Sequence, residues 1–143
     1  MSRVVLDASA VMGWCFEDEA DPAGDALLRR VAASGAVVPG LLALEVVNVL
    51  VGAERRGRIT PAESARFLGL LEALPIEVDA HTALRAPRET LLLARAHGLS
   101  SHDAAYLELA VRLGLPLATK DAALRAAAAA AGVAAGAVVG AGR

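Results

Sequence analysis

The sequence is poor in cysteine and in aromatic residues. Cys15 is the only cysteine among 143 residues, so the chain cannot form an internal disulfide framework, and it lacks the thiolates of a zinc module. Aromatic residues make up 3% of the chain while 56% is hydrophobic, which predicts a core built mainly from leucine and valine. Such an apolar surplus on one small domain predicts that some of it is buried against another copy or a partner protein.

An excess of positive charge is also missing. The formal net charge is -2, so no whole-domain field attracts a polyanion, and nucleic acid would have to be held locally. The chain carries no Walker-type phosphate loop and no Gly-x-Gly-x-x-Gly fingerprint, which counts against nucleotide hydrolysis and dinucleotide binding.

Targeting signals are absent as well. The N-terminal MSRVVLDAS enters a strand-like segment at once, without the apolar region of a secretory signal, and a cytoplasmic location is predicted. The uncharged segment 126–142 approaches the ~20 residues of a bilayer span. It consists largely of alanine and glycine and has no flanking aromatic belt, so no membrane association is predicted.

Short apolar segments alternate with helical ones along the chain. Strands are predicted over residues 3–6, 36–38, 76–78 and 116–119, with a further edge strand over 134–139. Helices are predicted over residues 21–33, 41–56, 82–96, 101–113 and 121–131, and another begins at Thr60 with the Thr-x-x-Glu capping box. The alternation indicates an α/β fold with a central parallel sheet covered on both faces. We expect a single domain over residues 1–139 and a disordered tail over 140–143.

Two aspartates follow predicted strands. Asp7 comes directly after Val4-Val5-Leu6, and Asp121 stands one residue beyond Leu117-Ala118-Thr119. Ligands of open α/β sheets bind beyond the carboxyl ends of the strands, which favours a functional site at these positions. Each aspartate also precedes a helical segment, so a helix N-cap is the competing interpretation.

Glu45 and Asn48 are the only polar residues of the segment LLALEVVNVLV. They are three positions apart and therefore share a helix face. A carboxylate on such an apolar helix needs a partner, which a metal ion would provide. Alternatively, Gly52 and Arg55 continue the same face as a narrow solvated stripe.

Asp103 lies on the inward face of its predicted helix. Tyr106 and Leu107 fall within the same half-circle, whereas Glu108 and Arg112 project from the opposite side. The competing interpretation is a first-turn residue that reciprocates a serine cap and is favoured by the helix dipole. That interpretation does not explain its inward direction.

Together these four acids predict a divalent-metal site at one edge of the sheet. Several oxygen ligands from separate elements are what a hard cation such as Mg²⁺ requires, with one or two carboxylates in direct contact and the others holding bound water. Three further residues are placed to orient the carboxylates, namely Ser9, Asn48 and Thr119. Each of the three could equally serve as a local cap or turn residue.

Few basic groups are placed to contact a substrate. His102 adjoins Asp103 and could approach a phosphate, although a solvated side chain is the simpler interpretation, as it is for His81 and His97. Arg55 and Arg56 end the helix that carries Glu45, where the helix dipole already favours cations. If that end borders the acids, the two arginines would hold a phosphate backbone.

These segments resemble the PIN-domain family, in particular the VapC-type ribonuclease toxins of bacterial toxin–antitoxin pairs. The matching stretches are Val5–Ser9 with Trp14, Pro39 through Leu50, Ser101–Ala110 and Leu117–Asp121, in the family's order and spacing. The resemblance implies an α/β/α three-layer PIN-like fold, RNA cleavage dependent on Mg²⁺ or Mn²⁺, a homodimer, and inhibition by a small antitoxin. It maps the family's acidic positions onto Asp7, Glu45, Asp103 and Asp121. Many relatives carry an aromatic residue where this chain has His102.

Two other functions fit parts of the pattern. A PIN-like domain could bind RNA or protein without cutting it. A phosphatase or phosphotransfer domain could use Asp7 as its nucleophile, although Ser9 stands where many such phosphatases have a second aspartate. Metal-dependent hydrolysis of RNA is the function that uses all four acids.

Overall fold

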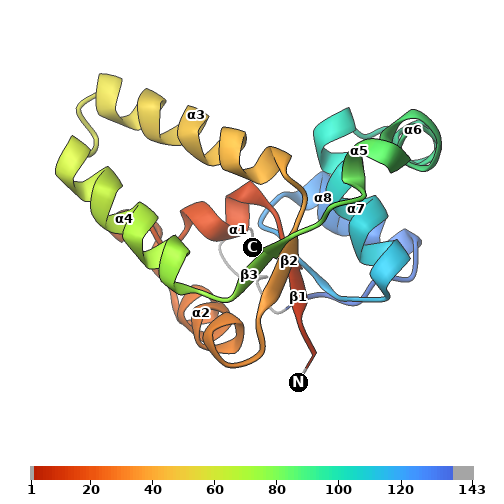
Figure 1. The fold of residues 1–143 in the computed structure, drawn as a ribbon, viewed down its shortest axis with the longest axis horizontal. Coiled ribbons are helices and arrows are strands. Elements are labelled where there is room, and N and C mark those ends of the chain that lie inside the picture. The colour runs from red at the N-terminus through yellow and green to blue at the C-terminus, as the bar shows by residue number, and fades with distance from the viewer. Residues whose placement is uncertain (1, 137–143) are drawn as a thin grey trace.

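Four short parallel strands form the centre of the fold in the computed structural model, which describes residues 2–136 (Figure 1). They are β1 (Val4–Leu6), β2 (Ala36–Val38), β3 (Ile76–Val78) and β4 (Leu117–Ala118), and their order across the sheet is β3-β2-β1-β4. Each lies where the apolar runs of the sequence predict a strand. The predicted α/β class with a central parallel sheet is confirmed.

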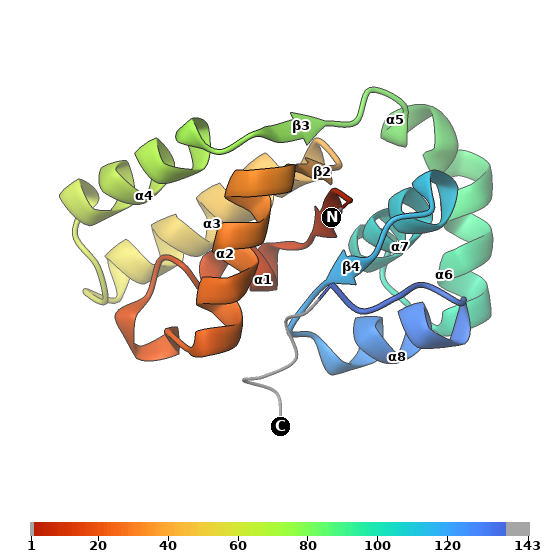
Figure 2. The same cartoon turned by 90° about the horizontal axis from the view of Figure 1, so that it is seen from below.

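The strand order explains how helices cover both faces. The chain steps from β1 to β2 to β3 in one direction and then crosses back over β2 and β1 to reach β4. Because parallel crossovers are right-handed, the two directions place their helices on opposite faces. Figures 1 and 2 show α1–α4 on one side of the sheet and α5–α8 on the other. These helices are α1 (Ala8–Met12), α2 (Pro22–Ser34), α3 (Leu41–Arg55), α4 (Pro61–Ala73), α5 (Thr82–Arg85), α6 (Leu91–His97), α7 (Ser101–Leu113) and α8 (Ala122–Ala130).

The helix ends follow the local chemistry of the sequence. The Thr60 hydroxyl accepts from the Glu63 amide at 3.1 Å, and the Glu63 carboxylate accepts from the Thr60 amide at 2.9 Å, which confirms the predicted capping box. Pro87 lies in η2, a single π-turn over Ala86–Thr90 that joins α5 to α6. The predicted helix over 82–96 is therefore interrupted at its proline, as the missing amide N–H requires.

The core is centred on β1 and α7. All of Val4–Leu6 is fully buried, because helices cover both faces of this central strand. In α7 every residue from Ala104 to Ala110 is buried, including Glu108 at 3% exposure. The side of α7 opposite Asp103 therefore packs against other parts of the same chain and is not exposed to solvent.

Three features differ from the sequence expectation. The short helix α1 and the 3₁₀ turn η1 (Glu17–Glu19) have no predicted boundaries, because both are too short for a periodic signal. Of the predicted strand over 134–139, Ala135 forms a parallel bridge with Leu117, while residues 137–139 and the predicted tail over 140–143 lie outside the described residues.

Across residues 2–136, no helix combines the length and apolar character needed to span a bilayer.

Candidate active site

Asp7 is the most buried of the four predicted acids, with 4% exposure. It follows β1 directly and caps α1, since its Oδ1 accepts from the Ala10 amide at 3.0 Å. Two hydroxyls also donate to the carboxylate, Ser9 to Oδ1 at 2.7 Å and Thr119 to Oδ2 at 2.5 Å. Burial raises the pKa of Asp7 although these hydrogen bonds oppose the shift, and the charge of Asp121 raises it further. The capping and functional interpretations are therefore compatible at this residue.

A small hydroxyl network joins the ends of β1 and β4. Ser9 Oγ lies 3.3 Å from Thr119 Oγ1 and accepts from the Lys120 amide at 2.8 Å. Thr119 Oγ1 in turn accepts from the Asp121 amide at 3.0 Å. The structure thus places Ser9 and Thr119 against Asp7, where they fix the position of both carboxylate oxygens.

Two groups from α7 contact Glu45 of α3. The Tyr106 hydroxyl donates to Oε1 at 2.5 Å, and His102 Nδ1 lies 3.4 Å from Oε2. Burial and the neighbouring Glu45 raise the pKa of Tyr106 well above its usual value, so the phenol stays protonated and remains a donor. His102 is 64% exposed, as expected for a solvated side chain, but its ring nitrogen faces Glu45.

Asp103 and Asp121 complete the cluster. Asp103 begins α7, and its amide donates to the Ser100 cap at 3.1 Å, while Asp121 caps α8 by accepting from the Leu124 amide at 2.9 Å. Burial raises the pKa of Asp103, and the charges of Asp121, Asp7 and Glu45 raise it further. The four acids, predicted from separate segments, therefore lie in one electrostatic neighbourhood.

The negative charge of the cluster is partly compensated by His102, which lowers the pKa of Asp103 against the effect of the three carboxylates. Among residues 2–136 none of the four carboxylates forms an ion pair with a lysine or arginine; His102 beside Glu45 is the one ring within reach. Like charges gathered without a partner destabilise the fold, and such a cost is typical of functional sites.

The cluster suits a hard divalent cation in its chemistry, because all four of its candidate donors are carboxylates. Within residues 2–136, however, no three acidic, histidine or cysteine side chains stand close enough to grip one ion. Mg²⁺ usually retains several waters and contacts one or two carboxylates directly, so it does not require three side chains within direct coordination distance. Asp7, Glu45, Asp103 and Asp121 are the residues that would hold it.

The other predicted contacts lie elsewhere. Asn48 is exposed one turn beyond Glu45, and no hydrogen bond from its side chain is present within residues 2–136. Arg55 and Arg56 are exposed at the opposite end of α3, ten or more residues and about 15 Å along the helix from Glu45 (Figure 1). The structure therefore separates these two arginines from the acids.

The sequence argument missed three contacts at the site. The Tyr106 hydroxyl and the His102 ring both bind Glu45, and their spacing of four on α7 is the signal that could have paired them with one acceptor. Lys120 covers Gly13, where an added Cβ would meet the ammonium nitrogen at 2.6 Å. No sequence pattern indicates that last contact.

The chain as a whole matches a known family. The family model of the PIN domain matches residues 4–130, and the chain belongs to the PIN-domain family.

A curated relative is Ribonuclease VapC3 of Pyrobaculum aerophilum, 28% identical over 122 residues, which cover 85% of this chain and 92% of the relative. The crystal structure of PAE2754 from Pyrobaculum aerophilum is similar with a TM-score of 0.66 and 26% identity, covering 88% of this chain and 86% of that one. A toxin–antitoxin complex from Klebsiella pneumoniae shares the fold with a TM-score of 0.53 and 15% identity, over 82% and 86% of the two chains.

Proposed function

We propose that this protein is a divalent-metal-dependent endoribonuclease and the toxin of a toxin–antitoxin pair. The observation that carries the proposal is the gathering of four carboxylates that form no ion pair with a lysine or arginine among residues 2–136; burial raises the pKa of Asp103, and the other three carboxylates raise it further. Membership of the PIN-domain family and the similarity to a ribonuclease of the VapC type support RNA as the substrate.

The proposed roles follow from the contacts. Ser9 and Thr119 hold the two oxygens of Asp7, and Tyr106 holds one oxygen of Glu45, so these donors would fix the orientation of both carboxylates as metal ligands. Among the contacts of residues 2–136 the Asp103 carboxylate has no such donor, and as a metal ligand it would act in its charged form. A bound Mg²⁺ or Mn²⁺ would supply a polarised water and neutralise charge on a phosphodiester.

A cleavage assay tests the proposal. The purified chain is incubated with mixed RNAs in Mg²⁺, in Mn²⁺ and in chelator, beside Asp7→Asn and the control Asp25→Asn, which changes an exposed acid of α2. We expect cleavage in either metal for the wild type and for Asp25→Asn, and none in chelator or for Asp7→Asn. Cleavage by a folded Asp7→Asn at the wild-type rate would exclude that residue from the reaction.

The proposal extends to partners and location. It includes a small antitoxin that binds this chain, a homodimer, and the cytoplasm. Exposed leucines and valines such as Leu44, Val47 and Leu84 support burial against other proteins. Sedimentation at micromolar concentration tests the homodimer, and a monomer at all concentrations would contradict it. An RNA-binding domain without activity is the rival, and metal-dependent cleavage distinguishes the two.

A further inference from the structure

A cavity of about 500 Å³ lies beside the acidic cluster. It is bounded by the start of α3, by the α5–η2–α6 segment and by the first turns of α7. Alanines at several wall positions leave the space open, and the residues used below are Leu41, Asp79, Ala83, Thr90, Ser101 and His102. Its volume is within the range of small-molecule sites, which are typically about 300–1,000 Å³.

The cavity and the acids share a wall. His102 lines the cavity, and its Nδ1 lies 3.4 Å from Glu45 Oε2. Leu41 also lines it and stands four residues before Glu45 on α3. The His102 ring therefore lies between the cavity and the Glu45 carboxylate. A phosphodiester bound at the acids would be separated from the cavity by this one ring.

An unsatisfied hydroxyl lies in the cavity wall. Thr90 is 3% exposed, and its Oγ1 has no hydrogen-bond partner among residues 2–136. A buried hydroxyl without a partner is costly, and it is explained if a ligand supplies one. Thr90 ends the π-turn η2, a backbone feature that is frequent at functional sites.

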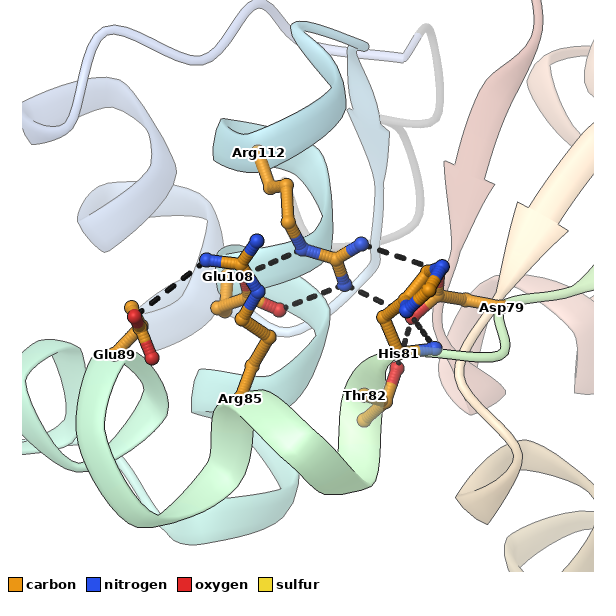
Figure 3. Close-up of polar contacts among 7 residues, drawn as sticks. All are labelled: Asp79, His81, Thr82, Arg85, Glu89, Glu108 and Arg112. Carbon is orange, nitrogen blue, oxygen red and sulfur yellow. Dashed lines mark hydrogen bonds and ion pairs between the residues drawn. The ribbon is translucent and has the colours of Figure 1, made fainter.

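Asp79 is the acid that lines the cavity wall, and its carboxylate is engaged in hydrogen bonds with neighbouring residues. The Asp79 carboxylate accepts two hydrogen bonds from Arg112 at 2.8 and 3.2 Å, one from the Thr82 hydroxyl and one from the His81 amide (Figure 3). The Asp79 carboxylate is thus held by internal donors, and its charge is partly compensated by Arg112, which Glu108 shares. The hydroxyls of Thr90 and Ser101 and the ring of His102 remain to contact a ligand.

We propose that this cavity binds a nucleobase of the substrate RNA, next to the phosphodiester that is cut. The inference rests on the proposed function and adds a site for base selection. A nucleobase has apolar faces, which suit the alanine and leucine walls, and a polar edge, which suits the Thr90 hydroxyl. Histidine commonly stacks on unpaired RNA bases, and His102 stands between the cavity and the acids. A side chain from a second copy of this protein is the competing occupant.

Binding without catalysis is measured first. The four nucleoside 5′-monophosphates are titrated into the chain in chelator and followed by NMR chemical shifts, so the result does not depend on RNA cleavage. We expect one or two of them to bind at the cavity with shifts at Thr90, Ser101 and His102. Thr90→Val keeps the shape and removes the hydroxyl; it should weaken that binding about tenfold, while its melting temperature stays at or above that of the wild type. A clear fall in melting temperature would show that the hydroxyl has an internal partner and overturn the assignment.

Filling the cavity gives the second arm. Ala83→Phe places a large side chain at a position that lines the cavity. Ala65→Phe, at an exposed position of α4, is the matched control. We expect Ala83→Phe to abolish nucleotide binding and to change the base preference at cleaved ends in RNA sequencing, and Ala65→Phe to change neither. Cleavage with no base binding and an unchanged preference would overturn this inference and leave the nuclease standing. Base binding without cleavage would support the base site and overturn the proposed nuclease function. A change of oligomeric state alone in Ala83→Phe would assign the cavity to a second copy.

Discussion

The two halves of α7 contribute to two acidic clusters, which differ in how the negative charge of their carboxylates is compensated. At its start, Asp103 joins three other carboxylates with no lysine or arginine partner in the described residues, and its pKa is raised. At its end, Glu108 and Asp79 share Arg112, and the pKa of Asp79 is lowered to about 2 (Figure 3). In the first cluster Asp7 is buried and Asp121 is exposed, whereas both acids of the second are nearly buried. The opposite pKa shifts of Asp103 and Asp79 follow the presence of an arginine partner in the second cluster only, and the cluster that lacks this partner is the one that we propose to be functional.

The largest expected difference between the clusters is in activity. Asp103→Asn removes a charge from the first cluster, and Glu108→Gln removes one from the second. We expect Asp103→Asn to slow RNA cleavage in Mg²⁺ by at least about a thousandfold, some 4 kcal/mol in the barrier, since it removes a proposed ligand. Glu108→Gln, measured at equal concentration of folded protein, should cleave within a few-fold of the wild type. Equal loss in both variants would mean that the clusters do not differ in function.

The second cluster should matter more for the free energy of unfolding than for activity. Arg112 is 14% exposed and holds two nearly buried acids, so Arg112→Met leaves both without a partner. Breaking such a pair costs about 3 kcal/mol of unfolding free energy. Arg3→Met breaks the exposed pair with Glu77 and should cost under about 1 kcal/mol. Urea unfolding measures both values, and similar losses would show that the Arg112 cluster does not hold the fold.

The comparison also shows where the sequence was informative. The strand boundaries, the capping box and the positions of Asp7, Glu45, Asp103 and Asp121 were predictable, because each depends on local pattern plus the rule that parallel strands end at one edge. Arg112 and Asp79 are 33 positions apart, and no periodic pattern pairs them. Glu108 was correctly placed opposite Asp103, but only the packing of η2 and α6 against α7 shows that this side is buried.

Arg55 and Arg56 illustrate a different limit. The sequence places them on the helix of Glu45, yet it does not say which end of that helix borders the site. The structure sets Glu45 in the early turns of α3 and the arginines at its far end. Contacts to substrate are better sought at His102, which local pattern left as a solvated side chain and which the structure sets against Glu45.

Acid sensitivity should follow the second cluster. The folded pKa of Asp79 is about 2, below its ordinary value of 3.8, so its contribution is complete above pH 4 and is lost as the pH falls through 2. Asp79→Asn should therefore reduce the unfolding free energy by about 2 kcal/mol at pH 7, with a difference that shrinks between pH 4 and 2. Urea unfolding at several pH values tests this. A difference that does not change with pH would assign the loss to packing.

Metal should stabilise only through the first cluster. Binding to the folded state at tenfold excess over the dissociation constant adds about 1.4 kcal/mol, or a few degrees of melting temperature. We expect Mg²⁺ to raise the melting temperature of the wild type and of Glu108→Gln, and to leave Asp103→Asn almost unchanged. Calorimetry with and without Mg²⁺ gives the comparison. An equal shift in Asp103→Asn would place the ion elsewhere.

The smallest expected effect concerns the metal-free protein. A raised folded pKa means that charged Asp103 opposes folding at neutral pH, and protonation relieves this as the pH falls. Asp103→Asn should therefore raise the melting temperature in chelator at pH 7 by roughly 2 °C, with no gain near pH 3. A lowered melting temperature at pH 7 would show that the Asp103 charge has a stabilising partner.

The strand order has a consequence for how the protein is made. The central strand β1 is translated before the other three strands, yet one of its neighbours, β4, is translated after all of them, and the Thr119–Asp7 hydrogen bond spans 112 positions. Contacts of such long sequence separation slow folding. A nascent chain on the ribosome, or one truncated before β4, therefore holds Asp7 without the hydroxyl that orients it and without Asp121. Synthesis itself therefore delays the assembly of the proposed nuclease site until β4 and Asp121 have been made.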